Sequence, residues 1–373
     1  MVTTDARDRL DRAQRATRDA GIDALIVTPG ADLRYLTGYE ALPLERLTCL
    51  MLPADGDPVL VVPALEKPAA LASPVGALDL DVLAWGETDD PYALTASLLP
   101  ASTTTVAVDN HMWAEKVLAL AAAVPKARQV LAGTVLRELR MRKTSAEVSA
   151  LRAAGVAIDA VHDRMGEWLR PGRSEREVGR DIADAIIAAG HARVDFVIVA
   201  SGPNGSSPHH DLSDRVVEAG DPVVVDIGGT MPDGYCSDST RTYVAGDTPP
   251  KAFRDYYSVL LEAQQAQCAY ARSGVSAESV DRVGRDIITA AGYGEEFLHR
   301  TGHGIGLETH EEPYIVAGNE LELEVGMVFS IEPGIYLEGR HGARIEDIVV
   351  CTTDGIERLN RTSRQLAVLD AGG

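Results

Sequence analysis

Cysteine is scarce in this sequence, and no two cysteines form a Cys-x-x-Cys pair. The four cysteines are scattered over the chain, which argues against structural disulfides and fits a reducing cytoplasm. No apolar run approaches the length of a membrane span, and residues 1–10 are too charged and polar for a signal peptide. These absences predict a soluble cytoplasmic protein.

Positive charge is also in deficit, with 35 lysines and arginines against 56 aspartates and glutamates and a net charge of −21. Nucleic acids and anionic membranes are polyanions, so this imbalance argues against both as partners. Hydrophobic residues make up 45% of the 373 residues, which is typical of a globular chain rather than a disordered one. The length is sufficient for two domains.

Strand and helix signals alternate in the first third of the chain. Short apolar runs predict strands at residues 24–27, 48–52, 59–62, 80–84 and 105–108. Helical spacing predicts helices at residues 8–20, 92–99 and 113–123. We therefore expect an α/β domain over residues 1–133, followed by a helical linker over residues 134–144.

A second domain is expected over residues 145–373. Helical periodicity predicts helices at 145–169 and 174–189, and Ser174 with Glu177 three residues later has the spacing of a capping box. Further helices are expected at 253–271 and 276–290, and strands at 196–200, 223–227, 328–331 and 345–351. The whole chain is thus predicted to be of the α/β (α+β) class.

Four acids and one histidine lie on or beside the predicted strands of the second domain: Asp226, Asp238, His303, Glu332 and Glu346. This oxygen-rich set suits two divalent cations of the manganese, cobalt or zinc kind better than one structural zinc ion. Two cations would also balance four clustered carboxylates. A single aspartate at a strand end is more often a turn or cap residue, so the prediction depends on the surrounding motifs.

Five motifs surround these residues and occur in one order: Asp226-Ile227-Gly228, Ser237-Asp238-Ser239-Thr240-Arg241-Thr242, Gly302-His303-Gly304-Ile305-Gly306, Ile331-Glu332-Pro333-Gly334 and Arg344-Ile345-Glu346-Asp347. Together they resemble the pita-bread metallopeptidases, which include creatinase-like enzymes, methionine aminopeptidase, aminopeptidase P and prolidase. Pro208-His209, and His310 seven residues after His303, narrow the resemblance to the proline-specific branch. The resemblance covers the whole chain. In its overall length and small N-terminal domain, the chain looks like the bacterial Xaa-Pro dipeptidases. The resemblance implies a creatinase-like N-terminal domain and a C-terminal pita-bread domain.

The resemblance implies a role for each ligand candidate. Asp226 would chelate one cation, Asp238 and Glu346 would bridge two cations, and His303 and Glu332 would complete the second. Paired cations of this kind activate water for hydrolysis near neutral pH. Manganese is the first expectation for both cations, with cobalt or zinc as alternatives.

A catalytic set is implied in the same way. Glu332 would also accept a proton, while His209 and His310 would bind the scissile carbonyl oxygen or stabilise the tetrahedral oxyanion. Arg344, together with Thr240, would orient the ligands or neutralise charge around them.

The implied reaction is hydrolysis of the bond N-terminal to proline in Xaa-Pro dipeptides or short peptides. This bond is a tertiary amide without an N–H group. The N-terminal domain would support a homodimer and help to close the active site of the neighbouring subunit, with residues 32–38 near the entrance. The expected partners are therefore a small peptide substrate and a second copy of the chain.

Two positions depart from the family pattern. Asp226 and Asp238 are twelve residues apart where eleven is usual, and we expect a longer hairpin loop to absorb the extra residue. Tyr314 stands where some prolidases carry an arginine that holds the C-terminal carboxylate of the substrate. An aminopeptidase P-type preference for longer peptides therefore stays open, with Arg340, Arg344 or a residue of a partner subunit as candidates to replace the missing arginine.

Other polar residues near the motifs have simpler interpretations. Asp347 is expected to form a salt bridge rather than to bind metal, and His210 to be structural. His299 and His341 are expected on the surface or in loops. Three further histidines without a partner motif are expected to be structural: His111, His162 and His191.

Three rival functions remain for a chain with these motifs. A creatinase-like hydrolase would act on a small non-peptide substrate, but such members often lose metal ligands, and all five candidates are present here. Methionine aminopeptidases usually lack so large an N-terminal domain. A binding module on this fold would have lost the site.

Overall fold

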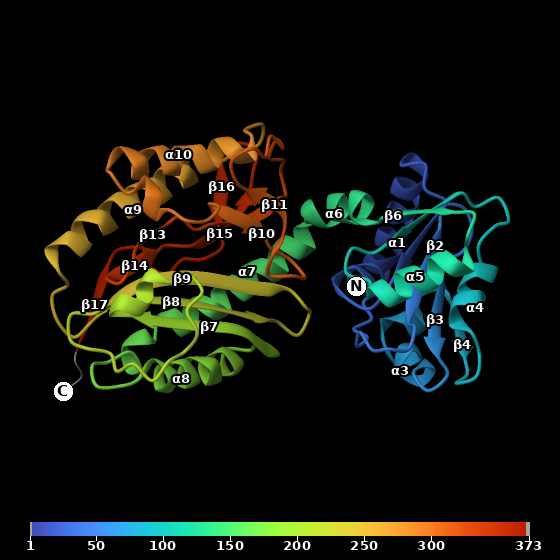
Figure 1. The fold of residues 1–373 in the computed structure, drawn as a ribbon, viewed down its shortest axis with the longest axis horizontal. Helices are drawn as coiled ribbons and strands as arrows, with labels where there is room; N and C mark the ends of the chain where they lie inside the picture. The colour runs from blue at the N-terminus through green and yellow to red at the C-terminus, as the bar shows by residue number, and fades with distance from the viewer. Residues whose placement is uncertain (1, 371–373) are drawn as a thin grey trace. The chain divides into compact units, whose positions relative to one another are not determined.

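The computed structural model describes residues 2–370, and the chain divides into two compact units between Arg140 and Met141 (Figure 1). This division falls inside the predicted linker, 134–144, whose bounds stay a prediction. Within residues 2–370, no helix is both long enough and apolar enough to cross a membrane.

The N-terminal unit is built on a six-stranded sheet with the strand order β4-β3-β2-β1-β5-β6. The strands are β1 (Ala24–Val27), β2 (Cys49–Pro53), β3 (Val59–Pro63), β4 (Asp81–Trp85), β5 (Thr105–Val108) and β6 (Arg128–Leu131). The helices are α1 (Val2–Asp19), α2 (Ala31–Thr37), α3 (Lys67–Ala72), α4 (Pro91–Ser97), α5 (Ala114–Ala123) and α6 (Gly133–Met141). β1 is antiparallel to β2 and parallel to β5, and all of its residues are buried. The five strands predicted in this region are confirmed to within one residue at each end.

Three elements of this unit were not predicted: α2, α3 and β6. β6 lies at the sheet edge and has no buried residue, so its sequence lacks the apolar run that marks a strand. α2 and α3 have only seven and six residues, which is too short to establish a helical period.

The C-terminal unit contains two larger sheets and a hairpin. One sheet has the order β17-β9-β8-β7 and the other the order β11-β10-β12-β15-β16, while β13 and β14 form the hairpin. The strands are β7 (Arg193–Ser201), β8 (Pro222–Thr230), β9 (Cys236–Ala245), β10 (Gly302–Gly304), β11 (Glu311–Ile315), β12 (Val328–Ile331), β13 (Gly334–Leu337), β14 (His341–Arg344), β15 (Asp347–Cys351), β16 (Ile356–Arg358) and β17 (Ala367–Leu369). The helices are α7 (Ser145–His162), α8 (Glu175–Ala188), α9 (Lys251–Tyr270) and α10 (Ala277–Ala290).

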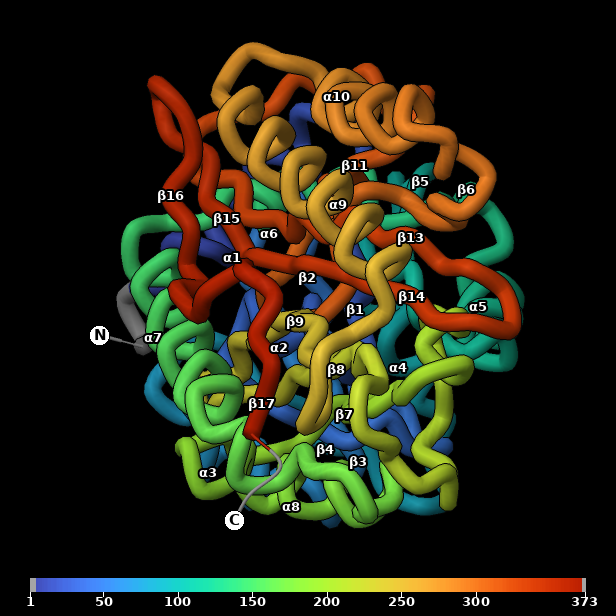
Figure 2. Tube along the Cα trace, turned by 90° about the vertical axis from the view of Figure 1, so that its left-hand side faces the viewer, coloured from blue at the N-terminus to red at the C-terminus, as the bar shows by residue number. Residues whose placement is uncertain are grey.

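Helices cover the outer faces of these sheets. α8 lies on the opposite side of the strands from α9 and α10 (Figure 1), and the strands β17, β9, β8 and β7 follow one another across the unit in Figure 2. Apolar side chains of α7 and α8, such as Ile158 and Ile182, pack against Val225 and Ile227 of β8. A second core lies between α10 and strands β12 and β15. Polar residues on these strands, such as Asp226 on β8 and Asp238 on β9, are therefore held by a rigid framework.

The first helix of this unit ends earlier than predicted. Thr144 caps α7 in a capping box with Glu147, and the helix ends at His162 rather than near Leu169. The chain then tightens into a 3-10 turn over Met165–Glu167. Met165, Trp168 and Leu169 remain buried in the core, so the apolar periodicity continues although the α-helix has ended. The capping box at Ser174 that begins α8 is confirmed.

Candidate metal centre

Asp226 and Asp238 lie on the neighbouring strands β8 and β9. These strands pair antiparallel, with Asp226 opposite Thr240 and Asp238 opposite Gly228. Residues two apart on a strand share a face, so both aspartates face the same side of the sheet. The loop of residues 231–235 joins the strands outside this pairing. The long spacing therefore leaves the two aspartates on one face.

His303 and Glu332 reach the site from the second sheet. Nδ1 of His303 lies 3.1 Å from the carbonyl oxygen of Gly304, a contact in which the ring donates and Nε2 is left facing the acids. Nε2 lies 3.1 Å from Glu332 Oε1 and 3.7 Å from Asp238 Oδ2. The Ser330 hydroxyl donates to Glu332 Oε1 over 3.1 Å and accepts from the backbone N–H of His303 over 3.0 Å. Ser330 thus fixes both residues.

Glu346 enters the site from the connection between β14 and β15. The predicted continuous strand over residues 345–351 is wrong, because β14 ends before Ile345 and β15 begins after Glu346. The backbone N–H of Glu346 instead donates to the carbonyl oxygen of Thr240 over 3.1 Å. The Thr240 hydroxyl donates in turn to Glu346 Oε2 over 2.8 Å. This exchange with β9 aims the carboxylate toward the two aspartates.

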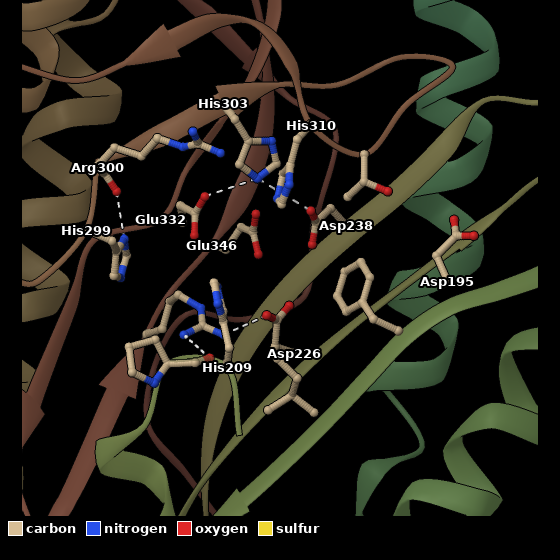
Figure 3. A pocket seen from close by; sticks show the side chains of 15 residues that line it. Asp195, His209, Asp226, Asp238, His299, Arg300, His303, His310, Glu332 and Glu346 are labelled. Carbon is tan, nitrogen blue, oxygen red and sulfur yellow. Dashed lines mark hydrogen bonds and ion pairs between the residues drawn. The ribbon is translucent and has the colours of Figure 1, made fainter. Parts of the chain in front are cut away.

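All five predicted ligands converge in one place (Figure 3). One ligand atom from each of Asp238, His303 and Glu346 lies within 4.8 Å of the other two, and all three residues are buried. Asp226 and Glu332 border the same cavity. Residues separated by up to 120 positions are therefore brought together as a set that could hold metal.

The acids of this cluster strongly affect one another. Burial, followed by the charges of Glu346, Asp226 and Glu332, raises the pKa of Asp238 well above its usual range. Burial, followed by Glu332 and Asp226, raises the pKa of Glu346 in the same way. Burial also acts to raise the pKa of Glu332, but the hydrogen bond and charge of His303, together with the charges of His299 and Arg344, lower that pKa to about 2. Bound cations relieve this kind of repulsion.

Two buried carboxylate oxygens of the cluster, Asp226 Oδ1 and Glu346 Oε1, have no hydrogen-bond partner among the described residues. A buried anionic oxygen is costly unless it is paired or coordinates a cation. Four carboxylates and one imidazole also form a donor set that first-row divalent cations accept. The residues therefore fit a divalent metal site.

Arg344 is held by one acid of the cluster and by neighbouring side chains. Its Nη2 donates to Asp226 Oδ2 over 2.6 Å, its Nη1 to the Tyr336 hydroxyl over 2.7 Å, and its Nε to Thr240 Oγ1 over 3.1 Å. Only 3% of the side chain is exposed. These contacts link Arg344 directly to Asp226, and to Glu346 through Thr240.

His209 and His310, the two predicted catalytic histidines, border the cavity and are exposed (Figure 3). The ring of His310 stands edge-on to that of His303, with 4.1 Å between centroids. Partial burial, followed by His303 and Arg300, lowers the pKa of His310 to about 4. A neutral imidazole with one N–H can donate a hydrogen bond to a substrate oxygen. His209 follows the short turn Gly202–Ser206 and faces the same cavity.

The cavity has a volume of about 790 Å³, and β7 forms one of its walls. The prediction of a fully buried strand at residues 196–200 is partly wrong, because Phe196 and Ile198 are only partly buried and line the cavity. Ile198 pairs with Asp226 across the sheet, so it shares the face of the ligands. A volume of this size suits a small ligand.

His299 was expected on the surface or in a loop. It does lie in the loop before β10, but it is half-buried and lines the cavity, which was not predicted. Its Nε2 lies 2.8 Å from the Tyr336 hydroxyl, its Nδ1 lies 2.7 Å from the carbonyl oxygen of Arg300, and both His299 and Arg300 line the cavity. Burial lowers the pKa of His299. The available signal was the nearness of His299 and Arg300 to the motif around His303.

The predictions for other polar residues are mostly confirmed. Asp347 forms a buried ion pair with Arg241 over 2.7 Å, and His210 Nε2 lies 2.8 Å from Glu175 Oε2. His341 is half-buried at the start of β14, where Tyr256 contacts it, and so is not a surface residue. Two histidines are buried with hydrogen-bonded rings: His162 and His191.

Comparison with known proteins covers both units of the chain. Residues 149–353 match Metallopeptidase family M24, and residues 9–142 match the Creatinase/Prolidase N-terminal domain. The chain is 38% identical over 374 residues to a Xaa-Pro dipeptidase of Lactobacillus helveticus, with 96% of this chain and 98% of the relative covered.

Two solved structures are also similar over nearly their full length. The crystal structure of dipeptidase PepE from Mycobacterium ulcerans has a TM-score of 0.95 at 52% identity and covers 99% of each chain. A recombinant prolidase from Thermococcus sibiricus has a TM-score of 0.91 at 37% identity, with 98% of this chain and 99% of that chain covered. This chain therefore belongs to metallopeptidase family M24, with a creatinase-like N-terminal domain and a pita-bread catalytic domain.

Proposed function

We propose that this chain hydrolyses the peptide bond N-terminal to proline in Xaa-Pro dipeptides, with two divalent cations bound by Asp226, Asp238, His303, Glu332 and Glu346. The observation that carries the proposal is the buried cluster of four carboxylates and one imidazole, with Asp226 Oδ1 and Glu346 Oε1 lacking partners among the described residues. The relatives named Xaa-Pro dipeptidase and prolidase support the choice of substrate.

The chain's own residues would bind and orient the substrate around this cluster. When bound, the cations supply a nucleophile at neutral pH and positive charge for the carbonyl oxygen. His209 and His310 would donate hydrogen bonds to that oxygen as negative charge develops on it. Glu332 would accept the proton released by the nucleophile. Arg344 would hold Asp226 and Thr240 in place throughout.

A preference for dipeptides requires a group that binds the free carboxylate of proline. Arg340 borders a different hollow, beside Pro222 and His341, and Arg344 is fully engaged by buried partners. Arg300 lines the cavity, and no ion pair to it is found among residues 2–370. We propose that Arg300 binds the C-terminal carboxylate of the substrate.

A second candidate is an Xaa-Pro aminopeptidase that acts on longer peptides. The observation in its favour is Tyr314, which stands where some prolidases have arginine. If Arg300 bound no carboxylate, the cavity would have no reason to prefer a dipeptide over a longer chain.

We further propose that the cations are manganese, with cobalt or zinc as alternatives, and that the protein is a cytoplasmic homodimer. The oxygen-rich donor set supports the proposed metals. The match to the Creatinase/Prolidase N-terminal domain supports the proposed homodimer by resemblance. Light scattering of the purified protein tests the oligomeric state, and a fully active monomer would contradict it.

One experiment tests the reaction itself. Chelated protein is reloaded separately with manganese, cobalt and zinc, and assayed on Ala-Pro, Ala-Pro-Ala and Ala-Ala. We expect Ala-Pro to be cleaved fastest and Ala-Ala not at all. Faster cleavage of the tripeptide would favour the aminopeptidase, and no cleavage of either prolyl peptide would refute both. The matched control is Asp238→Asn, which should lose both metal and activity.

A further inference from the structure

Asp195 borders the cavity although it was not expected to be near the site. Phe196 and Ile198 face the cavity, whereas Val197 and Val199 pack in the core behind the sheet. Side chains alternate between the faces of a strand, so Asp195 should share the core side with Val197. Instead, the neighbours Asp195 and Phe196 both line the cavity.

A β-bulge explains this arrangement. Val194 pairs with Gly229 and Phe196 with Gly228, so Asp195 is an extra residue with no partner on β8. A bulge of this kind redirects the side chain of the added residue and often occurs next to active sites. The strand therefore turns one carboxylate from the core side into the cavity.

The Asp195 carboxylate is held in a fixed orientation. The Thr230 hydroxyl donates to Oδ2 over 2.6 Å, and Arg193 Nε donates to Oδ1 over 2.7 Å. The Asp195 side chain is only 14% exposed, whereas that of Arg193 is 62% exposed. Solvent screens the charge of so exposed an arginine, so Arg193 compensates Asp195 only in part. Each oxygen retains capacity to accept a further hydrogen bond.

Charge balance distinguishes Asp195 from the other acids of the cavity. Two divalent cations would neutralise the four carboxylates of the metal cluster. Arg344 is bonded to one of these, Asp226, within the cluster. Figure 3 shows Asp195 on the far side of that cluster from Arg300. Asp195 and Arg300 are thus the charges of the cavity wall that lie outside the cluster, and they lie apart from each other.

We propose that Asp195 is a specificity-determining residue that binds a cationic side chain on the N-terminal residue of the substrate, so that Lys-Pro and Arg-Pro are preferred. This proposal rests on the proposed function. The α-ammonium group lies one carbon atom from the scissile carbonyl and must therefore stay near the cluster. A lysine side chain can reach the wall beyond it, with Phe196 and Ile198 beside its methylene groups and Asp195 at its ammonium.

The test compares lysyl-proline with norleucyl-proline, which has the same length but no side-chain charge. We expect the wild type to cleave lysyl-proline with a kcat/KM about tenfold higher, as a charge-assisted hydrogen bond would give. Asp195→Asn should reduce that ratio to about one by lowering kcat/KM for lysyl-proline. Arg193→Gln removes the competing cation and should raise the ratio, a change opposite to that of Asp195→Asn.

Each result supports or overturns the assignment. A wild-type ratio of one, or an unchanged ratio in Asp195→Asn, overturns it. If Asp195→Asn does not fold, Arg193→Gln decides, because its exposed side chain can be replaced at little cost, and an unchanged ratio then overturns the assignment. Wild-type protein that cleaves neither dipeptide refutes the proposed function itself. Cleavage of norleucyl-proline without any preference for lysyl-proline refutes only the role of Asp195.

Discussion

The guanidinium of Arg300 lies over the ring of Tyr314, with 4.4 Å between Cζ and the ring centroid. By the family resemblance, Tyr314 occupies the position at which some prolidases carry their carboxylate-binding arginine. A cation over an aromatic face is attracted by the ring and keeps its hydrogen-bond donors free at the edge. The stacked pair can therefore present a cation to the cavity even though position 314 has none.

Replacing Arg300 by glutamine should weaken binding of dipeptides that have a free carboxylate. Loss of a charge-assisted pair corresponds to an increase in KM of about 10- to 100-fold. Alanyl-prolinamide has no carboxylate, so its KM should not change. Tyr314→Phe keeps the ring and is the matched control. If Arg300→Gln raised the KM of both substrates equally, the arginine would act on something other than the carboxylate.

Removing one acid from the cluster should separate metal binding from folding. Asp238→Asn loses a proposed bridging ligand, so the rise in melting temperature that manganese causes in the wild type should largely disappear. At a metal concentration one hundred times Kd, binding stabilises the folded state by about 2.7 kcal/mol. Without metal, the variant should melt no lower than the wild type, because burial, followed by the neighbouring carboxylates, raises the pKa of Asp238.

Calorimetry with and without chelator measures both effects. Glu320→Gln changes an exposed acid outside the cavity lining and serves as the control for charge alone. An undiminished manganese response in Asp238→Asn would show that this residue is not a ligand.

The ion pair between Lys143 and Glu311 should stabilise the catalytic unit. The two charges lie 2.6 Å apart, with 1% and 8% of their side chains exposed. Lys143→Met leaves a buried carboxylate without this cation, which should cost about 3–5 kcal/mol of unfolding free energy. Arg142→Gln breaks the adjacent but exposed pair with Glu324 and should cost at most about 1 kcal/mol. Urea denaturation measures the unfolding free energy of both variants. Equal losses would mean that burial does not determine how much each ion pair stabilises the protein.

The cluster of five candidate ligands could be predicted from sequence because each residue lies in a short motif, and the five motifs in order resemble those of the pita-bread metallopeptidases. His303 is an example, since it lies between two glycines in β10. Asp195 could not be predicted, because nothing in its own sequence indicates that the strand gains a residue there. That bulge is set by the pairing of β7 with β8, which is a long-range property.

Arg300 was missed for a similar reason. Its position three residues before His303 indicated nearness to the site, but its proposed role also depends on stacking against Tyr314, fourteen positions away, which no local pattern indicates. His162 was predicted to be structural only because no motif surrounded it. The structure adds that its ring is fully enclosed, bonded to the Tyr243 hydroxyl over 2.9 Å.

Burial of His162 should make the protein sensitive to acid in a defined pH range. Burial, followed by the charge of Arg241, lowers the pKa of His162 from 6.5 to about 3. The unfolded chain therefore binds a proton below about pH 6.5 that the folded chain excludes until about pH 3. The stabilising contribution is complete above pH 6.5 and is lost as the pH falls, by up to about 1.4 kcal/mol per pH unit.

His162→Gln removes this titration, so its unfolding free energy should fall less steeply than that of the wild type between pH 6.5 and 4. At pH 8 the variant should be the less stable of the two, because the hydrogen bonds of the imidazole to Tyr243 and Ser239 are disturbed. Urea denaturation in the presence of chelator excludes effects of pH on metal binding, and the difference between the two proteins cancels titrations that they share. His111→Gln, at an exposed histidine, is the matched control and should follow the wild type. Parallel curves for His162→Gln and the wild type would mean that His162 is protonated equally in the folded and unfolded states.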